Sequence, residues 1–283
     1  MKFWKMHGLG NDYIVIDNRN GKLKEEEIPD LARRLCKRRF SVGADGILLV
    51  YNSKVADVRM RMFNPDGSEA EMCGNGIRCL IKFCFDQGIV KNEYVEVETL
   101  AGIKQTWLNI QNGKVKSVKV DMGAPTFERK SIPMLGEGTF IDQDLEVNDV
   151  TLKATALSVG NPHCVIFVDD VKDYPVEKLG PAIERHELFP KRTNVEFVKV
   201  LSRDELQVRV WERGAGETLA CGTGACASVV AATLLRKIDG AATVHLLGGD
   251  LEIEYANNIF MAVSYTHLRA HETRHDLVCR LLL

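Results

Sequence analysis

A four-residue motif that occurs twice is the strongest constraint on how this chain can fold. The sequence CGNG at residues 73–76 returns as CGTG at residues 221–224, 148 positions later, and each copy leads into an apolar stretch with helical character. Five of sixteen positions are identical between residues 61–76 and residues 209–224, where average composition gives about one by chance. This long period indicates a duplicated domain, because solenoid repeats recur about every 20–50 residues.

Matches outside the motif extend the repeat in both directions. Asn11 and Asn161 stand at an offset of 150, and Phe40 and Phe189 at an offset of 149. We therefore expect two similar halves, each with its own hydrophobic core.

The composition excludes several classes of protein. The chain has 283 residues, 45% hydrophobic and 27% charged, with a net charge of −2, so the basic excess of a nucleic-acid-binding protein is missing. The eight cysteines form no CxxC pair, so neither a zinc site nor a disulfide framework is expected, and a reducing cytoplasm fits best. The first residues lack the apolar core of a signal peptide. The uncharged run at residues 218–235 is expected to be a helix in a protein core and not a membrane span.

Alternating apolar residues and turn signals predict many strands and few helices. Strands are expected at residues 13–17, 45–51, 57–63, 94–99, 105–110, 115–121, 152–158, 164–168, 194–200, 206–212, 242–247 and 250–255. Helices are expected at residues 24–39, 74–87, 176–187 and from 222 to about 236, and residues 131–150 are expected to be irregular.

The helices that follow the two cysteines are apolar on nearly all sides, so both must be enclosed. The predicted fold class is therefore α+β, with two pseudo-symmetric domains, each a curved, mostly antiparallel, barrel-like sheet wrapped round a central helix. The domains are expected at residues 1–121 and 122–263, with the boundary at the MGAP sequence of residues 122–125. Residues 264–283 lose the strand alternation and crowd three of the seven histidines together, so they are interpreted as an atypical, non-native tail.

Two cysteines at glycine-rich helix starts suggest acid–base chemistry. Free N–H groups and the positive end of the helix dipole favour a thiolate there, and the same groups can hold a carboxylate. A thiolate on one face of an α-carbon can remove a proton while a thiol on the other face returns one, which inverts the stereocentre without a cofactor. We therefore interpret Cys73 and Cys221 as a pair that acts on one ligand.

At these residues the chain resembles the diaminopimelate epimerase family, cofactor-independent enzymes of lysine and cell-wall precursor synthesis. The motifs that carry the resemblance are HGLGNDY (7–13), FNPDGSEA (63–70), MCGNGIRC (72–79), GNPHC (160–164), RTNVEF (192–197), ERGAGET (212–218) and ACGTG (220–224). The resemblance covers about residues 1–262 and departs after Met261, where the family ends in another strand-forming segment.

The resemblance implies interconversion of LL- and meso-diaminopimelate, with the site in a cleft between the domains and Cys73 and Cys221 as the two bases. It further implies that the reacting carboxylate is held by the backbone N–H groups of Gly74, Asn75, Gly222 and Thr223, with Glu212 beside it. The distal end is expected to be bound by Asn11, Asn64, Asn161, Asn194 and Arg213, with His163 nearby. A guanidinium can hold a carboxylate bidentately, which suits a substrate with two amino-acid ends. The implied partner is this small molecule alone, with no metal, nucleic acid or membrane, in a cytoplasmic homodimer.

Other readings of the same residues remain open. A proline-type racemase would use the same two cysteines but has no need of Asn64, Asn194 and Arg213. A thiol redox protein would join the two cysteines in a disulfide, and a phosphate-binding module would use only the glycine-rich helix starts. His163 could be structural, and Glu212 with Arg213 could be a surface ion pair.

Two further sets of residues are expected to be structural. Glu69 and Glu217, matched across the repeat, are expected to support the loop before each helix. The cysteines that are expected to be buried apolar residues are Cys36, Cys79, Cys84, Cys164 and Cys226.

Overall fold

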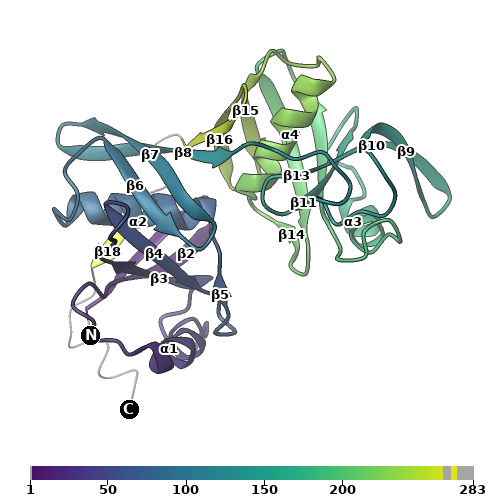
Figure 1. Cartoon of the computed structure of the whole chain (residues 1–283). Helices are drawn as coiled ribbons and strands as arrows, with labels where there is room; N and C mark the ends of the chain where they lie inside the picture. Colours follow the sequence, from purple (N-terminus) through teal and green to yellow (C-terminus); the bar gives the residue numbers. More distant parts are fainter. Residues whose placement is uncertain (1, 264–268, 273–283) are drawn as a thin grey trace. The chain divides into compact units, whose positions relative to one another are not determined.

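The structure, a computed structural model, describes residues 2–263 and 269–272. The chain divides into two compact units: unit 1 comprises Met1–Val120 with Ser264–Leu283, and unit 2 comprises Asp121–Val263. Figure 1 shows the helices and strands of both units.

Unit 1 is built mainly of strands. Its elements are β1 (Trp4–Gly8), β2 (Asn11–Asp17), a 3-10 turn η1 (Glu25–Glu27), α1 (Ile28–Leu35), β3 (Gly46–Tyr51), β4 (Val58–Phe63), β5 (Glu69–Ala70), α2 (Gly74–Asp86), β6 (Tyr94–Thr99), β7 (Gly102–Gln111), β8 (Lys114–Gly123) and β18 (Arg269–Glu272). Strands β1, β2, β3, β4, β6, β7 and β8 are neighbours in that order, antiparallel except for the parallel pairs β2–β3 and β4–β6.

Unit 2 repeats this order of strands. Its elements are β9 (Phe140–Val147), β10 (Val150–Ser158), β11 (Pro162–Phe167), α3 (Val176–Glu184), β12 (Asn194–Val200), β13 (Glu205–Glu212), β14 (Gly216–Thr218), α4 (Gly222–Leu234), β15 (Ala241–Leu246), β16 (Gly249–Tyr255) and β17 (Ile259–Val263). The parallel pairs β11–β12 and β13–β15 fall at the places that correspond to β2–β3 and β4–β6 in unit 1. The expected duplication is therefore present in the topology.

Each cysteine motif leads into a helix that is enclosed by the strands of its own unit (Figure 1). Helix α2 packs on β1, β2, β3 and β4. Helix α4 packs on β10, β11, β12, β13, β15, β16 and β17, and every residue from Gly224 to Ala232 is buried. The expected fold class is confirmed: an α+β protein of two curved sheets, each wrapped round a helix. No helix in the described part of the chain is long and apolar enough to cross a membrane.

Several local expectations differ from the structure. Residues 140–147, expected to be irregular, form β9; Asp142 has a positive φ of 51° and the pairing with β10 shifts register, so the inward residues do not alternate regularly. The strand β1 and the short strands β5, β14 and β17 were also not expected. The surface helix expected at residues 24–39 is shorter, since only Ile28–Leu35 is α-helical after the turn η1.

The expected non-native tail lies mostly outside the described residues. Its described part, β18, pairs antiparallel with β1, at the place that β9 takes beside β10 in unit 2.

Candidate active site

In unit 1, Cys73 is the N-cap residue of α2. Its backbone is extended, with φ −143°, and its Sγ accepts a hydrogen bond from the backbone N–H of Gly76 at 3.4 Å. The thiol therefore lies among the free N–H groups of the first helical turn, where a negative charge is favoured.

A tyrosine that we did not predict as a site residue contacts this thiol. Tyr13 Oη lies 3.0 Å from Cys73 Sγ. Burial, and then the neighbouring Cys73, raises the pKa of Tyr13 well above its usual value, so the phenol keeps its proton. Tyr13 is therefore the donor when the cysteine is a thiolate. The only signal in the sequence was its place in the HGLGNDY motif.

Asn11 and Asn75 meet beside the start of α2. The Asn75 side chain donates from Nδ2 to Asn11 Oδ1 at 2.5 Å, and Asn11 Nδ2 donates to Asp45 at 3.3 Å. The buried Arg78 donates to Asn75 Oδ1 and, at 3.0 Å, to the carbonyl of Gly74. An arginine donor at one end and an aspartate acceptor at the other orient both amide groups. Neither Arg78 nor Asp45 was predicted.

In unit 2, Cys221 holds the same place as Cys73. It is the N-cap of α4 with φ −124°, and its Sγ accepts from Gly224 N at 3.4 Å and lies 3.4 Å from Thr223 Oγ1. Its surroundings are more acidic than those of Cys73. Burial, followed by the Glu212 and Glu196 carboxylates, raises the pKa of Cys221 well above its ordinary value, so the free protein holds it as a thiol.

His163 belongs to a buried chain of polar groups in unit 2. Its Nδ1 lies 2.7 Å from Glu196 Oε1 and its Nε2 lies 2.9 Å from Asn161 Oδ1. Asn161 in turn donates to Thr223 Oγ1 at 3.2 Å. The chain ends at the first turn of α4, next to Cys221. Glu196 was not predicted, although a carboxylate in the middle of an otherwise apolar strand was a usable signal.

The second glycine of the CGTG motif is required by close packing. A Cβ at Gly224 would lie 2.7 Å from Glu196 Oε1 and 3.3 Å from Cys221 Sγ. Only a residue without a side chain lets the carboxylate and the thiol approach the helix here.

The remaining predicted residues lie at the ends of strands: Asn64 directly follows β4, Arg213 directly follows β13, and Asn194 is the first residue of β12. Asn64 donates to Ser68 Oγ at 3.0 Å in the turn between β4 and β5. Asn194 Oδ1 accepts from the backbone N–H of Arg213 at 2.9 Å, and the Arg213 guanidinium donates to the carbonyl of Lys191 at 3.2 Å.

Glu212 accepts a hydrogen bond from Thr218 at 2.5 Å. Burial, which outweighs the effect of this hydrogen bond, raises the pKa of Glu212. Glu212 accepts from Thr218, and Arg213 donates to the carbonyl of Lys191. Glu212 and Arg213 therefore do not form the surface ion pair that was the alternative interpretation.

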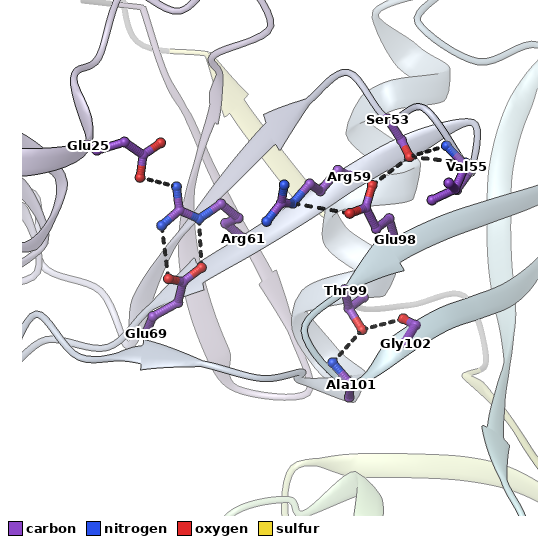
Figure 2. A network of polar contacts seen from close by, with 11 residues as sticks. Glu25, Ser53, Val55, Arg59, Arg61, Glu69, Glu98, Thr99, Ala101 and Gly102 are labelled. Carbon is purple, nitrogen blue, oxygen red and sulfur yellow. Dashed lines mark hydrogen bonds and ion pairs between the residues drawn. The ribbon is translucent and has the colours of Figure 1, made fainter.

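Both cysteine loops are held by a bidentate ion pair. Arg61 on β4 donates to both carboxylate oxygens of Glu69 at 2.6 and 2.9 Å and also contacts Glu25 (Figure 2). Arg209 donates to Glu217 at 2.6 and 3.0 Å in unit 2. The structural role expected for Glu69 and Glu217 is confirmed. The five other cysteines expected to be buried are buried as well.

The family model described as diaminopimelate epimerase matches residues 3–128 and 155–266. The chain belongs to the diaminopimelate epimerase family. A diaminopimelate epimerase from Moorella thermoacetica is 54% identical over 265 residues, which is 92% of this chain and 95% of that protein. One from Methanothermobacter thermautotrophicus is 54% identical over 255 residues, 89% of each chain. As a member of this family, the chain is an isomerase that acts on a small molecule.

Solved structures with low identity share the fold of this epimerase family. A hydroxyproline epimerase from Agrobacterium vitis aligns with TM-score 0.69 at 13% identity, covering 98% of this chain and 93% of that one. A Bacillus anthracis protein of the PhzF family aligns with TM-score 0.68 at 20% identity, covering 97% and 99%. These likenesses establish the fold alone. In the described part of the chain, no three His, Cys, Asp or Glu residues are grouped so that they could hold a metal ion.

Proposed function

We propose that this protein interconverts LL- and meso-diaminopimelate by moving one α-proton between Cys73 and Cys221. The observation that carries the proposal is made in both units: each has a cysteine at the N-cap of an enclosed helix, inside a glycine-rich turn. Membership of the family supports the substrate, since the relatives named above are diaminopimelate epimerases.

In the proposed reaction one cysteine is a thiolate and the other a thiol. The thiolate takes the α-proton, and the electron pair of the broken C–H bond moves onto the substrate carboxylate as an enolate. The thiol then gives its proton to the opposite face of the same carbon. The configuration is inverted and the two sulfurs have exchanged protonation states, so protons and charge balance without a cofactor.

The backbone N–H groups of Gly74, Asn75, Gly222 and Thr223 are proposed to hold the reacting carboxylate. They belong to the first turns of α2 and α4, where N–H groups have no helical partner. They therefore stabilise the negative charge that develops on the carboxylate in the enolate.

The other residues are proposed to bind the two ends of the substrate. Glu212 takes the amino group of the reacting end. His163 orients the side chain of Asn161 through the contact of its Nε2 with Asn161 Oδ1. The distal amino-acid end is assigned to Asn11, Asn64, Asn161, Asn194 and Arg213. We further propose that the protein is a cytoplasmic homodimer, which light scattering and cell fractionation test.

The deciding experiment uses reduced protein in heavy water with LL-diaminopimelate and no added pyridoxal phosphate. We expect meso-isomer with deuterium at the inverted carbon, and no inversion in Cys73→Ala or Cys221→Ala. Proline and hydroxyproline serve as comparison substrates. Turnover of these, with none of diaminopimelate, would keep the two-cysteine chemistry and reject the substrate. Undiminished inversion in either alanine variant would reject the mechanism.

A further inference from the structure

Arg213 lies in a turn whose backbone is held by two side-chain acceptors. The turn follows β13 and includes Gly214, which has a positive φ of 79°. Asn194 Oδ1 accepts from the N–H of Arg213 at 2.9 Å, and Glu184 Oε1 accepts from the N–H of Gly214 at 3.0 Å. Two consecutive backbone N–H groups are therefore each held by a side-chain oxygen, one from Asn194 and one from Glu184. These two hydrogen bonds set the direction in which the Arg213 side chain leaves the backbone.

Glu184 is a buried carboxylate with several donors. It is the last residue of α3 and only 2% exposed. Besides Gly214 it accepts from Trp211 Nε1 at 2.8 Å, through Oε2, and from Arg192 at 3.5 Å. A carboxylate in such a place costs free energy unless it is well hydrogen-bonded, so its partners specify one geometry.

The helix that carries Glu184 also fixes Trp211. A Cβ at Gly180 would lie 2.6 Å from Trp211 Cγ, so the indole ring rests directly on the helix backbone. Gly180 and Glu184 are four residues apart and share one face of α3. One helix face thus binds both the ring and the N–H of Trp211, two residues before Arg213.

Unit 1 lacks this arrangement, although it shares the rest of the framework. At the offset of 149 that relates Phe189 to Phe40, the place of Glu184, the last residue of α3, is taken by Leu35, the last residue of α1. At the offset of 148, Phe63 takes the place of Trp211 and Asp66 that of Gly214. The bidentate ion pairs of Arg61 and Arg209, by contrast, occur in both units. The contacts of Glu184 are therefore specific to the unit that carries Arg213.

We infer that Glu184 is a positioning residue, which sets the place of Arg213 and thereby the affinity for the distal carboxylate of the substrate. The inference rests on the proposed function, in which Arg213 binds that carboxylate. Glu184 acts through the backbone of the turn and takes no part in proton transfer, so substrate affinity and not the chemical step depends on it.

The first test is Glu184→Gln. The amide keeps an acceptor for Gly214 but turns an NH₂ group toward the Trp211 N–H, so the turn loses one of its supports. We expect KM for LL-diaminopimelate to rise about tenfold with kcat within about twofold. The matched control is Glu187→Gln, which removes the same charge at an exposed position three residues later and leaves KM unchanged.

A double-mutant cycle with Arg213→Lys separates positioning from a general structural role. If Glu184 acts through Arg213, Glu184→Gln raises KM by less than about threefold in the Arg213→Lys background. Should Glu184→Gln fail to fold, Trp211→Phe takes its place, because it keeps an aromatic ring on Gly180 and removes the N–H that Glu184 accepts. A rise in KM of about threefold is expected.

Three results overturn the inference: KM unchanged in folded Glu184→Gln and Trp211→Phe, a loss in kcat with KM unchanged, or KM effects that simply multiply in the cycle. In each of these the wild-type protein inverts diaminopimelate normally, so only the role of Glu184 is rejected. Absence of inversion by the wild type rejects the proposed function, and the assignment of Glu184 with it.

Discussion

The Oη of Tyr13 lies 3.0 Å from the Sγ of Cys73, whereas the hydroxyl at Cys221 Sγ is that of Thr223, at 3.4 Å. The residue that matches Tyr13 across the repeat is His163, whose ring nitrogens contact Glu196 and Asn161 instead. The two units therefore have the same backbone arrangement but give their cysteines different neighbours. Cys73 contacts the hydroxyl of Tyr13, whereas Cys221 contacts the hydroxyl of Thr223 and is influenced by the Glu212 and Glu196 carboxylates.

Tyr13→Phe should lower the rate of epimerisation without unfolding the protein. The ring is buried and phenylalanine fills the same space, so the cost in stability is limited to one hydrogen bond, about 1 kcal/mol. Without the donor, the Cys73 thiolate loses one stabilising contact, and we expect kcat to fall about 5- to 10-fold. Steady-state kinetics and thermal unfolding of the same sample measure both effects. An unchanged kcat would show that the hydroxyl has no part in the reaction.

The two bidentate ion pairs should differ in their effect on stability. Arg209 also donates from Nη1 to the carbonyls of Val171, Lys172 and Tyr174 at 2.9–3.1 Å, whereas the additional partner of Arg61 is the exposed Glu25. We expect Arg209→Ala to lower the free energy of unfolding by about 3 kcal/mol and Arg61→Ala by about 1–2 kcal/mol. Urea denaturation compares the two. An equal or larger loss for Arg61→Ala contradicts this ranking.

The cysteine helices could be predicted from the sequence because their signals are local. A cysteine, two glycines and an apolar run are adjacent in the chain, and the N-cap positions of Cys73 and Cys221 follow from them. Strand β9 could not be predicted, because a positive φ at Asp142 interrupts its alternation.

The roles of Glu184 and Glu196 were not predicted, for a different reason. Glu184 and Glu196 act on residues about 30 positions away in the chain, so their roles depend on tertiary packing. A single sequence shows only that they are acidic residues in otherwise apolar segments.

Gly76→Ala and Gly224→Ala form a matched pair across the repeat. Both residues lie in the first turn of a helix, where alanine alone would gain about 0.5–1 kcal/mol over glycine. A Cβ at Gly76 would lie 3.1 Å from the end of the Leu48 side chain, which can shift. At Gly224 it would lie 2.7 Å from Glu196 Oε1, which is held by His163.

We therefore expect Gly76→Ala to change the free energy of unfolding by less than about 1 kcal/mol, and Gly224→Ala to lower it by about 2–3 kcal/mol. Chemical denaturation of both variants measures the difference. If the two variants are equally stable, Glu196 moves more freely than its contacts indicate.

We expect Cys221 to be protonated in the free protein at neutral pH. Burial and the carboxylates of Glu212 and Glu196 raise its pKa well above the ordinary value for a thiol. Only the thiolate reacts with an alkylating agent, so alkylation of Cys221 should be slow and should rise about tenfold per pH unit between about pH 7 and pH 9. Mass mapping of the modified peptide after timed exposure to iodoacetamide follows this rate.

Glu212→Gln should speed that alkylation at pH 8. Removing a negative charge near the sulfur favours the thiolate, so the pKa of Cys221 moves down and the reactive fraction at a fixed pH rises, by about three- to tenfold. Glu187→Gln controls for loss of net charge, because Glu187 is exposed and lies in the turn after α3. Glu212→Gln should also be a poor epimerase, since Glu212 is proposed to bind the reacting end of the substrate. Faster alkylation together with slower epimerisation would separate the effect of the Glu212 charge on the Cys221 thiol from the role of Glu212 in substrate binding. If Glu212→Gln is alkylated only as fast as Glu187→Gln, Glu212 does not control the protonation of Cys221.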